Sequence, residues 1–244
     1  MLLRCFRAEM RKLRGSAVWL VFFAVPLIPA GYGTFNYLQN QGILSEGWYS
    51  LFTQHTLFYA MFFFAPMVGV YAGYLWRLEH RGGNWNLLMT APVPRFSIFA
   101  AKGMTALALA LLTQLWVFAL FVLCGKLFAR LPGLPPAEIL LWLLRGACGA
   151  LPVIALQLLL SMVIRSFAAP VLFALGGGVA GMLFCSRDMG LIWPYALMLL
   201  GMNSNRSEDV LAGGLFGYLL ACAGFTLLFG LLAAALLRRR DVRA

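Results

Sequence analysis

Charged residues are scarce in this 244-residue chain, where Asp, Glu, Lys and Arg together make up 11% of the sequence. Soluble domains usually carry roughly 25% charged residues, so the composition excludes an ordinary soluble domain. The 20 Phe, 8 Tyr and 7 Trp exclude a disordered chain, because disorder needs low hydrophobicity. With 62% hydrophobic residues, the sequence predicts an all-α polytopic membrane protein that forms a single transmembrane domain over residues 1–244.

Reactive side chains are equally few. The two histidines, His55 and His80, are expected on opposite membrane faces, so they cannot share a metal ion. No expected span contains Asp or Glu, which argues against a carrier that depends on a buried carboxylate. The ATP-binding loop G-x-x-x-x-G-K-[ST] is also missing, since Gly125 and Lys126 are followed by Leu127. The sequence therefore predicts no catalytic residues, no metal site and no cofactor bound by this chain.

The cysteines show none of the paired spacings that metal and redox sites use. The five are Cys5, Cys124, Cys148, Cys185 and Cys222. Most lie in apolar surroundings, which favours plain packing. Three of them, Cys124, Cys148 and Cys185, fall near the outer ends of expected spans, so a disulfide between two of these stays open.

Long uncharged intervals are what the chain has in abundance. A membrane core about 30 Å thick needs about 20 apolar helical residues. Six transmembrane helices are predicted near residues 17–38, 54–76, 98–124, 143–164, 166–185 and 213–237. A shorter apolar stretch within residues 186–209 ends in polar Asn203, Ser204 and Asn205. We interpret it as an extracellular, re-entrant segment before the sixth span. Arg145, near the outer end of the fourth span, is expected to snorkel to the interface.

The net charge of +11 orients these spans. Six spans place both termini on one side of the membrane, and cytoplasmic segments carry an excess of Lys and Arg. The side with the termini receives fourteen of the basic residues and three of the acids, which accounts for the whole net charge. The termini are therefore predicted to be cytoplasmic. Because topology explains the positive charge, no nucleic-acid partner is implied.

Residues 1–15 are predicted to form an amphipathic helix on the membrane surface. Apolar side chains recur at spacings of three and four, and an arginine directly follows each of them in the sequence, which forms a parallel basic stripe. The basic positions are Arg4, Arg7, Arg11 and Arg14. This stripe is expected to contact anionic membrane lipids. A cleavable signal peptide is the rival interpretation of residues 1–30, but the apolar run exceeds the usual length of a signal sequence.

The loop over residues 78–97, between the second and third spans, is compact and unusual. Asn84 is expected to cap a short helix that starts near Trp85, and Pro92 and Pro94 are expected to end it. The apolar side chains of this helix would face the cytosol; they are Leu87, Leu88 and Met89. Such a helix needs a cover, either the membrane surface or a groove in another protein.

The order of residues in this loop resembles that of the permease subunits of ABC-2 type exporters. That family has a Glu at the end of the second span, a Gly-rich turn, a short coupling helix, a Pro-rich exit ending in Arg, and a Lys in the third helix. The matching residues are Glu79, Gly82, Gly83, Trp85 to Met89, Pro92 to Arg95 and Lys102. The resemblance extends to the surface helix, the six spans and the re-entrant segment. It is greatest to the lantibiotic and bacteriocin immunity permeases.

The resemblance implies a non-catalytic subunit of an ATP-driven exporter in the bacterial cell membrane, which moves an antimicrobial peptide or another amphipathic substrate out of the membrane or cell. Separate ABC ATPase subunits would bind ATP and Mg²⁺. A second permease, either an identical copy or a sibling, would complete the transport path. The implied coupling residues are Glu79, Gly83, Trp85, Asn86, Leu87, Leu88, Met89 and Arg95. Glu79 is expected to pair with Arg77, Arg81 or Arg95.

Two other functions remain open at this point. A membrane enzyme acting on lipids or peptides would require a cluster of polar residues within the spans, which the sequence does not reveal. A non-transporting assembly subunit would complete a membrane complex without forming a path.

Overall fold

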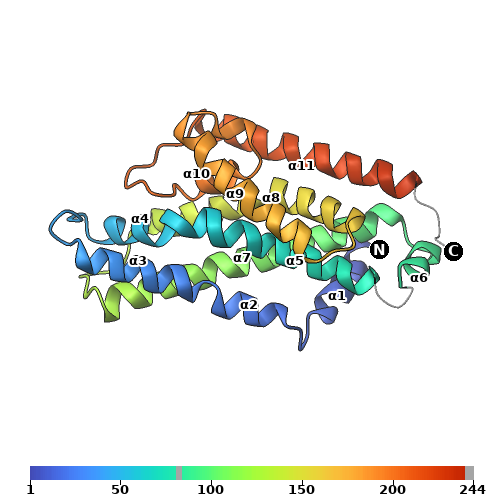
Figure 1. Cartoon of the computed structure of the whole chain (residues 1–244), viewed down its shortest axis with the longest axis horizontal. Coiled ribbons are helices and arrows are strands. Elements are labelled where there is room, and N and C mark those ends of the chain that lie inside the picture. Colours follow the sequence, from blue (N-terminus) through green and yellow to red (C-terminus); the bar gives the residue numbers. More distant parts are fainter. Residues whose placement is uncertain (81–83, 240–244) are drawn as a thin grey trace.

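The computed structural model describes residues 1–80 and 84–239, and every regular element within these ranges is helical (Figure 1). In chain order the elements are α1 (Leu2–Lys12), α2 (Val18–Ala24), α3 (Leu27–Gln39), α4 (Trp48–Phe58), η1 (Tyr59–Phe64), α5 (Ala65–His80), α6 (Asn84–Thr90), α7 (Arg95–Leu127), α8 (Ala137–Val163), α9 (Ala168–Ser186), η2 (Gly190–Ile192), α10 (Ala196–Gly201) and α11 (Gly214–Arg239). Residues 81–83 and 240–244 lie outside the described part.

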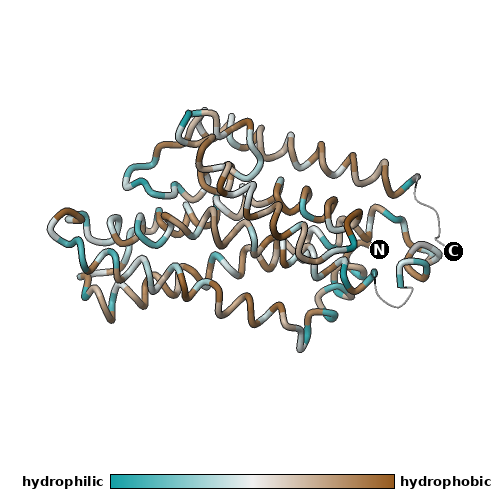
Figure 2. The backbone as a smooth tube through the Cα atoms, viewed as in Figure 1, coloured by the Kyte–Doolittle hydropathy of each residue, from teal (hydrophilic) through white to brown (hydrophobic). Residues whose placement is uncertain are grey.

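Six helical segments are long and apolar enough to cross a membrane, which confirms the predicted number of spans. They are Val18–Gln39, Trp48–His80, Arg95–Leu127, Ala137–Val163, Ala168–Ser186 and Gly214–Arg238. Figure 2 shows hydrophobic residues along these helices and hydrophilic residues gathered toward the ends of the bundle. Several helices are longer than predicted, so Glu79 and Glu138 belong to them. Both acids lie within two residues of a helix end, so the prediction that no membrane-embedded part contains an acid stays a prediction.

Two of the spans are interrupted. Pro26 lies between α2 and α3, where the missing N–H of proline prevents a continuous helix. The second span contains a π-helical turn, Tyr59–Phe64, followed at once by Pro66 in the first turn of α5. Both interruptions lie beside a proline, which has no backbone N–H to donate a helical hydrogen bond. The positions of the interruptions therefore follow from the sequence.

Helices α5 and α8 form the centre of the packed bundle, with α8 in contact with α5, α7, α10 and α11. Small residues allow the closest approaches between helices, because no side chain separates the backbones. A Cβ at Gly69 of α5 would lie 3.1 Å from the Cβ of Ala174 in α9, so this glycine lets the two helices pack closely. At Gly149 of α8, an added Cβ would clash with the carbonyl of Leu197 in α10.

The segment between α9 and α11 folds against the bundle. All six residues of α10 are buried, and this helix packs on α8 and α9. A turn at Asn203 and Asn205, both with positive φ, then leads toward α11. The segment predicted at residues 186–209 is therefore a compact helical excursion, and its re-entry into a membrane from outside stays a prediction.

The two ends of the bundle differ in what they carry. Figure 1 places α1, α6 and the last described turn of α11 at one end of the molecule. The connections α3–α4 and α7–α8 lie at the opposite end, with α10 toward it. The N-terminus and the end of α11 thus share one side, as an even number of spans requires.

Candidate functional site

Four charged side chains meet inside the α6 end of the bundle. The Lys102 Nζ atom lies 2.9 Å from Glu9 Oε2 and 2.9 Å from Glu79 Oε1. The Lys12 Nζ atom lies 2.7 Å from Glu9 Oε1 and 2.6 Å from Glu79 Oε1. Two ammonium groups and two carboxylates therefore form a closed, formally neutral set. We call Glu9, Lys12, Glu79 and Lys102 the ion quartet.

The ion quartet is shielded from solvent on its inner side. The Lys102 side chain is 0% exposed, and the side chains of Glu9 and Glu79 are 5% and 6% exposed. Lys102 also donates a hydrogen bond of 2.8 Å to the carbonyl of Leu75, and its Nζ lies 5.0 Å from the centre of the Trp76 ring. A buried charge is tolerated when it is paired and hydrogen-bonded, and here all three ammonium protons of Lys102 have a partner.

Lys12 closes the ion quartet at the surface, with a side chain that is 34% exposed. Burial alone would lower the pKa of Lys12, but the carboxylates of Glu9 and Glu79 outweigh this effect and raise the pKa above its ordinary value. Lys12 therefore stays charged at neutral pH, as the quartet requires.

Three helices that are distant in sequence are tied together by these four residues. Helix α1 supplies Glu9 and Lys12, α5 supplies Glu79 and α7 supplies Lys102. Helix α1 also packs along α7, and its Leu13 end is almost completely buried. The predicted surface helix is thus docked on the protein along one face. Its basic stripe faces outward, since Arg4, Arg7, Arg11 and Arg14 are exposed; contact of this stripe with lipid stays a prediction.

Helix α6 stands next to the ion quartet and is anchored by Trp85. This indole is buried, stacks on His80 with ring centres 5.8 Å apart and planes 10° apart, and packs 5.7 Å from Trp76. Trp76 in turn lies beneath Lys102. A continuous path of packed rings therefore runs from α6 to the quartet. Figure 1 shows α6 at the same end of the molecule as α1 and the last described turn of α11.

The other predicted coupling residues fall at different places around α6. Leu87 is 73% exposed, Leu88 packs against the core and Asn86 is half-buried. Arg95 begins α7, where its Nη1 donates a 2.9 Å hydrogen bond to the carbonyl of Leu237 in α11. Gly83 and the Met89 side chain lie outside the part that the structure describes.

The described residues give Glu79 and Asn84 partners that the sequence did not predict. Glu79 pairs with Lys12 and Lys102, whereas the guanidinium of Arg77 lies 5.3 Å from the centre of the Phe167 ring. Asn84 is the first residue of α6, and its Nδ2 donates a 3.0 Å hydrogen bond back to Leu78, so it satisfies a carbonyl at the end of α5. The suggested partner Arg81 lies outside the described residues.

Sequence reasoning also missed Glu9 and Lys12. A signal was present, because Glu9 lies one turn from Phe6 and from Leu13 on the apolar stripe of α1. An acid within such a stripe indicates a buried partner. Three interior hydrogen bonds were missed as well: Tyr59 to Gln114 at 2.9 Å, Tyr71 to Thr113 at 2.8 Å and Gln157 to Tyr195 at 2.6 Å. These join neighbouring helices.

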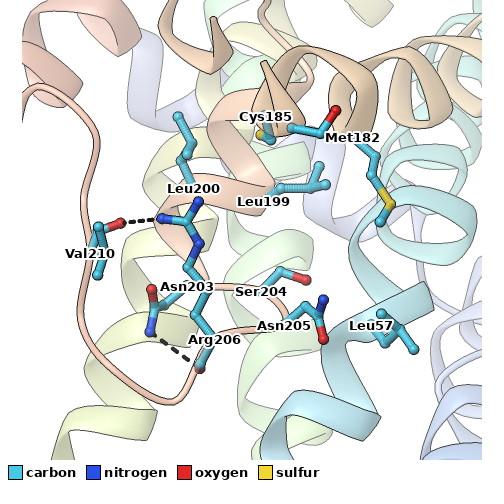
Figure 3. A pocket seen from close by; sticks show the side chains of 11 residues that line it. Leu57, Met182, Cys185, Leu199, Leu200, Asn203, Ser204, Asn205, Arg206 and Val210 are labelled. Atoms are coloured by element: carbon cyan, nitrogen blue, oxygen red, sulfur yellow. Dashed lines mark hydrogen bonds between the residues drawn. The ribbon is translucent and has the colours of Figure 1, made fainter. Parts of the chain in front are cut away.

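At the opposite end, a pocket of about 170 Å³ opens between α4, α9 and the turn after α10 (Figure 3). Its polar groups hold the surrounding loop together. Asn203 Nδ2 donates to the carbonyls of Arg206 and Glu208, and Arg206 Nη1 donates to the carbonyl of Val210. Ser204 ties the turn to α4 through the carbonyl of Thr56, at 2.8 Å.

Arg145 reaches from α8 to the loop that precedes α11, and its expected snorkelling to a membrane interface stays a prediction. Its Nη2 is 2.7 Å from Asp209 Oδ1, and its Nε donates a 2.8 Å hydrogen bond to the carbonyl of Gly201. The hydrogen bond from Arg145 lowers the pKa of Asp209 below its ordinary value. This ion pair links α8 to the loop between α10 and α11.

The described part of the chain offers little other chemistry. All five cysteines are free, so no disulfide joins Cys124, Cys148 or Cys185. Within residues 1–80 and 84–239, no three His, Cys, Asp or Glu side chains lie close enough together to hold a metal ion.

Six apolar helices long enough to cross a membrane define a multi-pass membrane protein. Residues 5–181 match the ABC-2 family transporter proteins, and the match includes the ion quartet and α6. The chain therefore belongs to the ABC-2 transporter family and is a membrane permease of an ABC transporter, a transport component that associates with an ATPase subunit. No curated protein matches the chain.

Proposed function

We propose that this chain is the permease subunit of a bacterial ATP-driven exporter, coupled through α6 to a separate ATPase subunit. Both termini lie in the cytoplasm in this proposal, so α6 faces the ATPase. The ATPase binds ATP and Mg²⁺, and this permease pairs with a second copy or a sibling in the cell membrane. The excess of basic residues at the α6 end supports this orientation.

The observation that carries the proposal is the two-sided character of α6. Its Trp85 is fixed to the bundle, while its Leu87 is 73% exposed. A short helix that presents an apolar side chain on a rigid base suits a groove in a partner protein. The partner would therefore gain a firm hold on the permease.

The ion quartet explains how a movement of α6 would spread. Closure of ATPase subunits moves their docked elements as rigid bodies. Trp85 transmits a displacement to α5 through Trp76 and His80, and the quartet joins α5 to α1 and α7. Three helices would thus shift together.

Docking can be tested by co-purification of tagged permease with the ATPase. Leu87→Asp places a charge in the proposed groove contact, so we expect ATPase recovery to fall about tenfold or more. Leu134→Asp is the matched control, because Leu134 is similarly exposed, at 80%, but lies in the α7–α8 connection at the opposite end. Equal recovery with both variants would contradict docking through α6.

The proposed cargo is an antimicrobial peptide of the lantibiotic or bacteriocin class, or a similar amphipathic molecule taken from the membrane. The apolar surfaces of the spans support this class, since exposed side chains such as Phe23, Phe35, Phe173 and Phe216 suit an amphipathic partner as well as lipid. Cells that make the permease and the ATPase should survive higher lantibiotic concentrations than cells that make Leu87→Asp. If docking holds but protection is absent, this cargo is wrong and the coupling role stands.

A further inference from the structure

Helix α11 touches the bundle firmly at two places and loosely between them. Near its start, Tyr218 is fully buried and its hydroxyl donates to the carbonyls of Arg145 and Leu197. Near its end, Ala233 and Leu237 are buried. Within the described helix, no residue from 223 to 232 is buried. The middle of α11 therefore packs less tightly than its two ends, although Phe225 and Phe229 contact the core clusters.

A groove of about 290 Å³ occupies this space between α7, α8 and α11. Its walls run from Phe96 to Leu107 on α7, from Leu151 to Leu158 on α8, and from Thr226 to Leu231 on α11. Its rim is open, because Phe96, Met104 and Leu227 are 50%, 39% and 65% exposed. The groove can therefore be entered from the side.

The groove is apolar throughout its described lining. Thr226 carries a hydroxyl, but this group donates a 2.7 Å hydrogen bond to the carbonyl of Cys222 within its own helix. Water in the groove would find no polar partners, and a stable buried water needs two to four of them. Within a membrane span, hydrocarbon is the natural occupant.

The length of the groove fits a single lipid leaflet. The eleven residue steps from Phe96 to Leu107 correspond to about 16 Å of helix, roughly half of a 30 Å hydrocarbon core. The groove begins at the α6 end, one residue after Arg95. An acyl chain that starts there would run toward the middle of the membrane.

Basic residues stand at the mouth of the groove. Arg95 contacts the carbonyl of Leu237, which places it beside the turn that carries exposed Arg238. Among the described acids at this end, Glu9 and Glu79 are both taken up by the ion quartet. A phosphate at the mouth would thus meet positive charge, which favours an anionic headgroup.

We propose that this groove binds one acyl chain of an anionic membrane phospholipid, whose phosphate lies beside Arg238 and Arg95. In the orientation proposed above, the lipid comes from the cytoplasmic leaflet. The bound chain fills the gap under α11 and holds this helix against α7 and α8.

Two glycines of α11 provide a matched test. An added Cβ at Gly230 or at Gly224 would meet no atom within 4 Å, but Gly230 lines the groove and Gly224 does not. Gly230→Leu should fill the groove without disturbing packing, whereas Gly224→Leu should leave it open. Arg238→Gln removes charge at the mouth and leaves the groove unchanged.

The probe is dioleoyl phosphatidylglycerol added to delipidated protein in detergent, with dioleoyl phosphatidylcholine for comparison and native mass spectrometry as the readout. We expect Gly230→Leu to weaken phosphatidylglycerol binding at least about tenfold while Gly224→Leu binds like wild type. Arg238→Gln should weaken phosphatidylglycerol about fivefold and leave phosphatidylcholine unchanged. Unchanged binding to Gly230→Leu, or equal affinity of the wild type for both lipids, would overturn the proposal.

A second measurement uses the unaltered protein in vesicles. The probe is phosphatidylglycerol with a photoreactive group on its acyl chain. It should label residues 96–107, 151–158 and 226–231 more strongly than the outward faces of α2 and α9. Labelling spread evenly over all exposed apolar faces would show ordinary lipid contact and overturn the proposal. Both tests are independent of ATPase docking, so their failure leaves the coupling role untouched.

Discussion

The two ends of the bundle each use ion pairs to join distant segments, but in opposite surroundings. At the α6 end, Lys102 is 0% exposed and belongs to a set of four charges. At the other end, Asp209 is 45% exposed and pairs with Arg145 alone. A buried pair is costly to break because the remaining charge is stranded, whereas solvent screens an exposed pair. The α6 end is therefore expected to move as one unit, and the opposite end to tolerate adjustment.

Lys102→Met should have the largest effect. It leaves two carboxylates with a single lysine in a buried site, and the loss of one partner from a buried ion pair costs about 3–5 kcal/mol. Thermal unfolding in detergent should show a clearly lower melting temperature than Arg145→Met. The double variant with Glu79→Met should recover part of the loss, because Glu9 and Lys12 then form a neutral pair. Equal melting temperatures of Lys102→Met and Arg145→Met would contradict the proposed difference between the two ends.

Lys12→Met should have an intermediate effect, centred on α1. Lys12 is partly exposed, so its removal is expected to cost about 1–2 kcal/mol, less than the loss of Lys102. Hydrogen exchange over residues 2–12 should speed up as α1 loosens. The matched control is Arg11→Met, which alters a neighbouring exposed cation outside the ion quartet. The docking of α1 by charge is refuted if both variants exchange at the same rate.

Asp209→Asn should have the smallest effect, about 0–1 kcal/mol at neutral pH. The pKa of Asp209 is lowered in the folded protein. Its stabilising contribution is therefore complete above the ordinary carboxylate pKa of about 3.9 and is lost as the pH falls through the lowered value. The difference in melting temperature between wild type and variant should stay constant from pH 7 to pH 5 and shrink below about pH 4. Neighbouring Glu208→Gln provides the control. A difference that already changes between pH 7 and pH 5 would contradict the assignment.

Features that depend on residues close together in the chain could be predicted from the sequence. Span number, the position of α6 and the presence of Glu79 and Lys102 near it followed from uncharged intervals and local residue order. These features depend on neighbours along the chain, which periodicity and composition record. The paired positions of the termini followed from charge distribution in the same way.

The pairing of residues in the ion quartet could not be predicted from such local patterns. Glu9 and Lys102 are 93 positions apart, and their contact depends on how α1 lies along α7. The side chain of Asn84 likewise donates to the carbonyl of Leu78 in α5, six positions earlier in the chain. Trp85 was expected on an exposed helix, but stacking on His80 and Trp76 buries it. Each of these depends on tertiary packing that local patterns leave unspecified.

Cysteine cross-linking at position 87 tests the central claim most directly. In a chain whose five native cysteines are replaced by alanine, Leu87→Cys should cross-link to the ATPase subunit in membranes, and Leu134→Cys should not. The cross-link should form from the cytosolic side, with position 87 inaccessible to an impermeant thiol reagent in intact cells. Labelling of position 87 from outside the cell, or an ATPase that cross-links equally to position 134, would contradict the account.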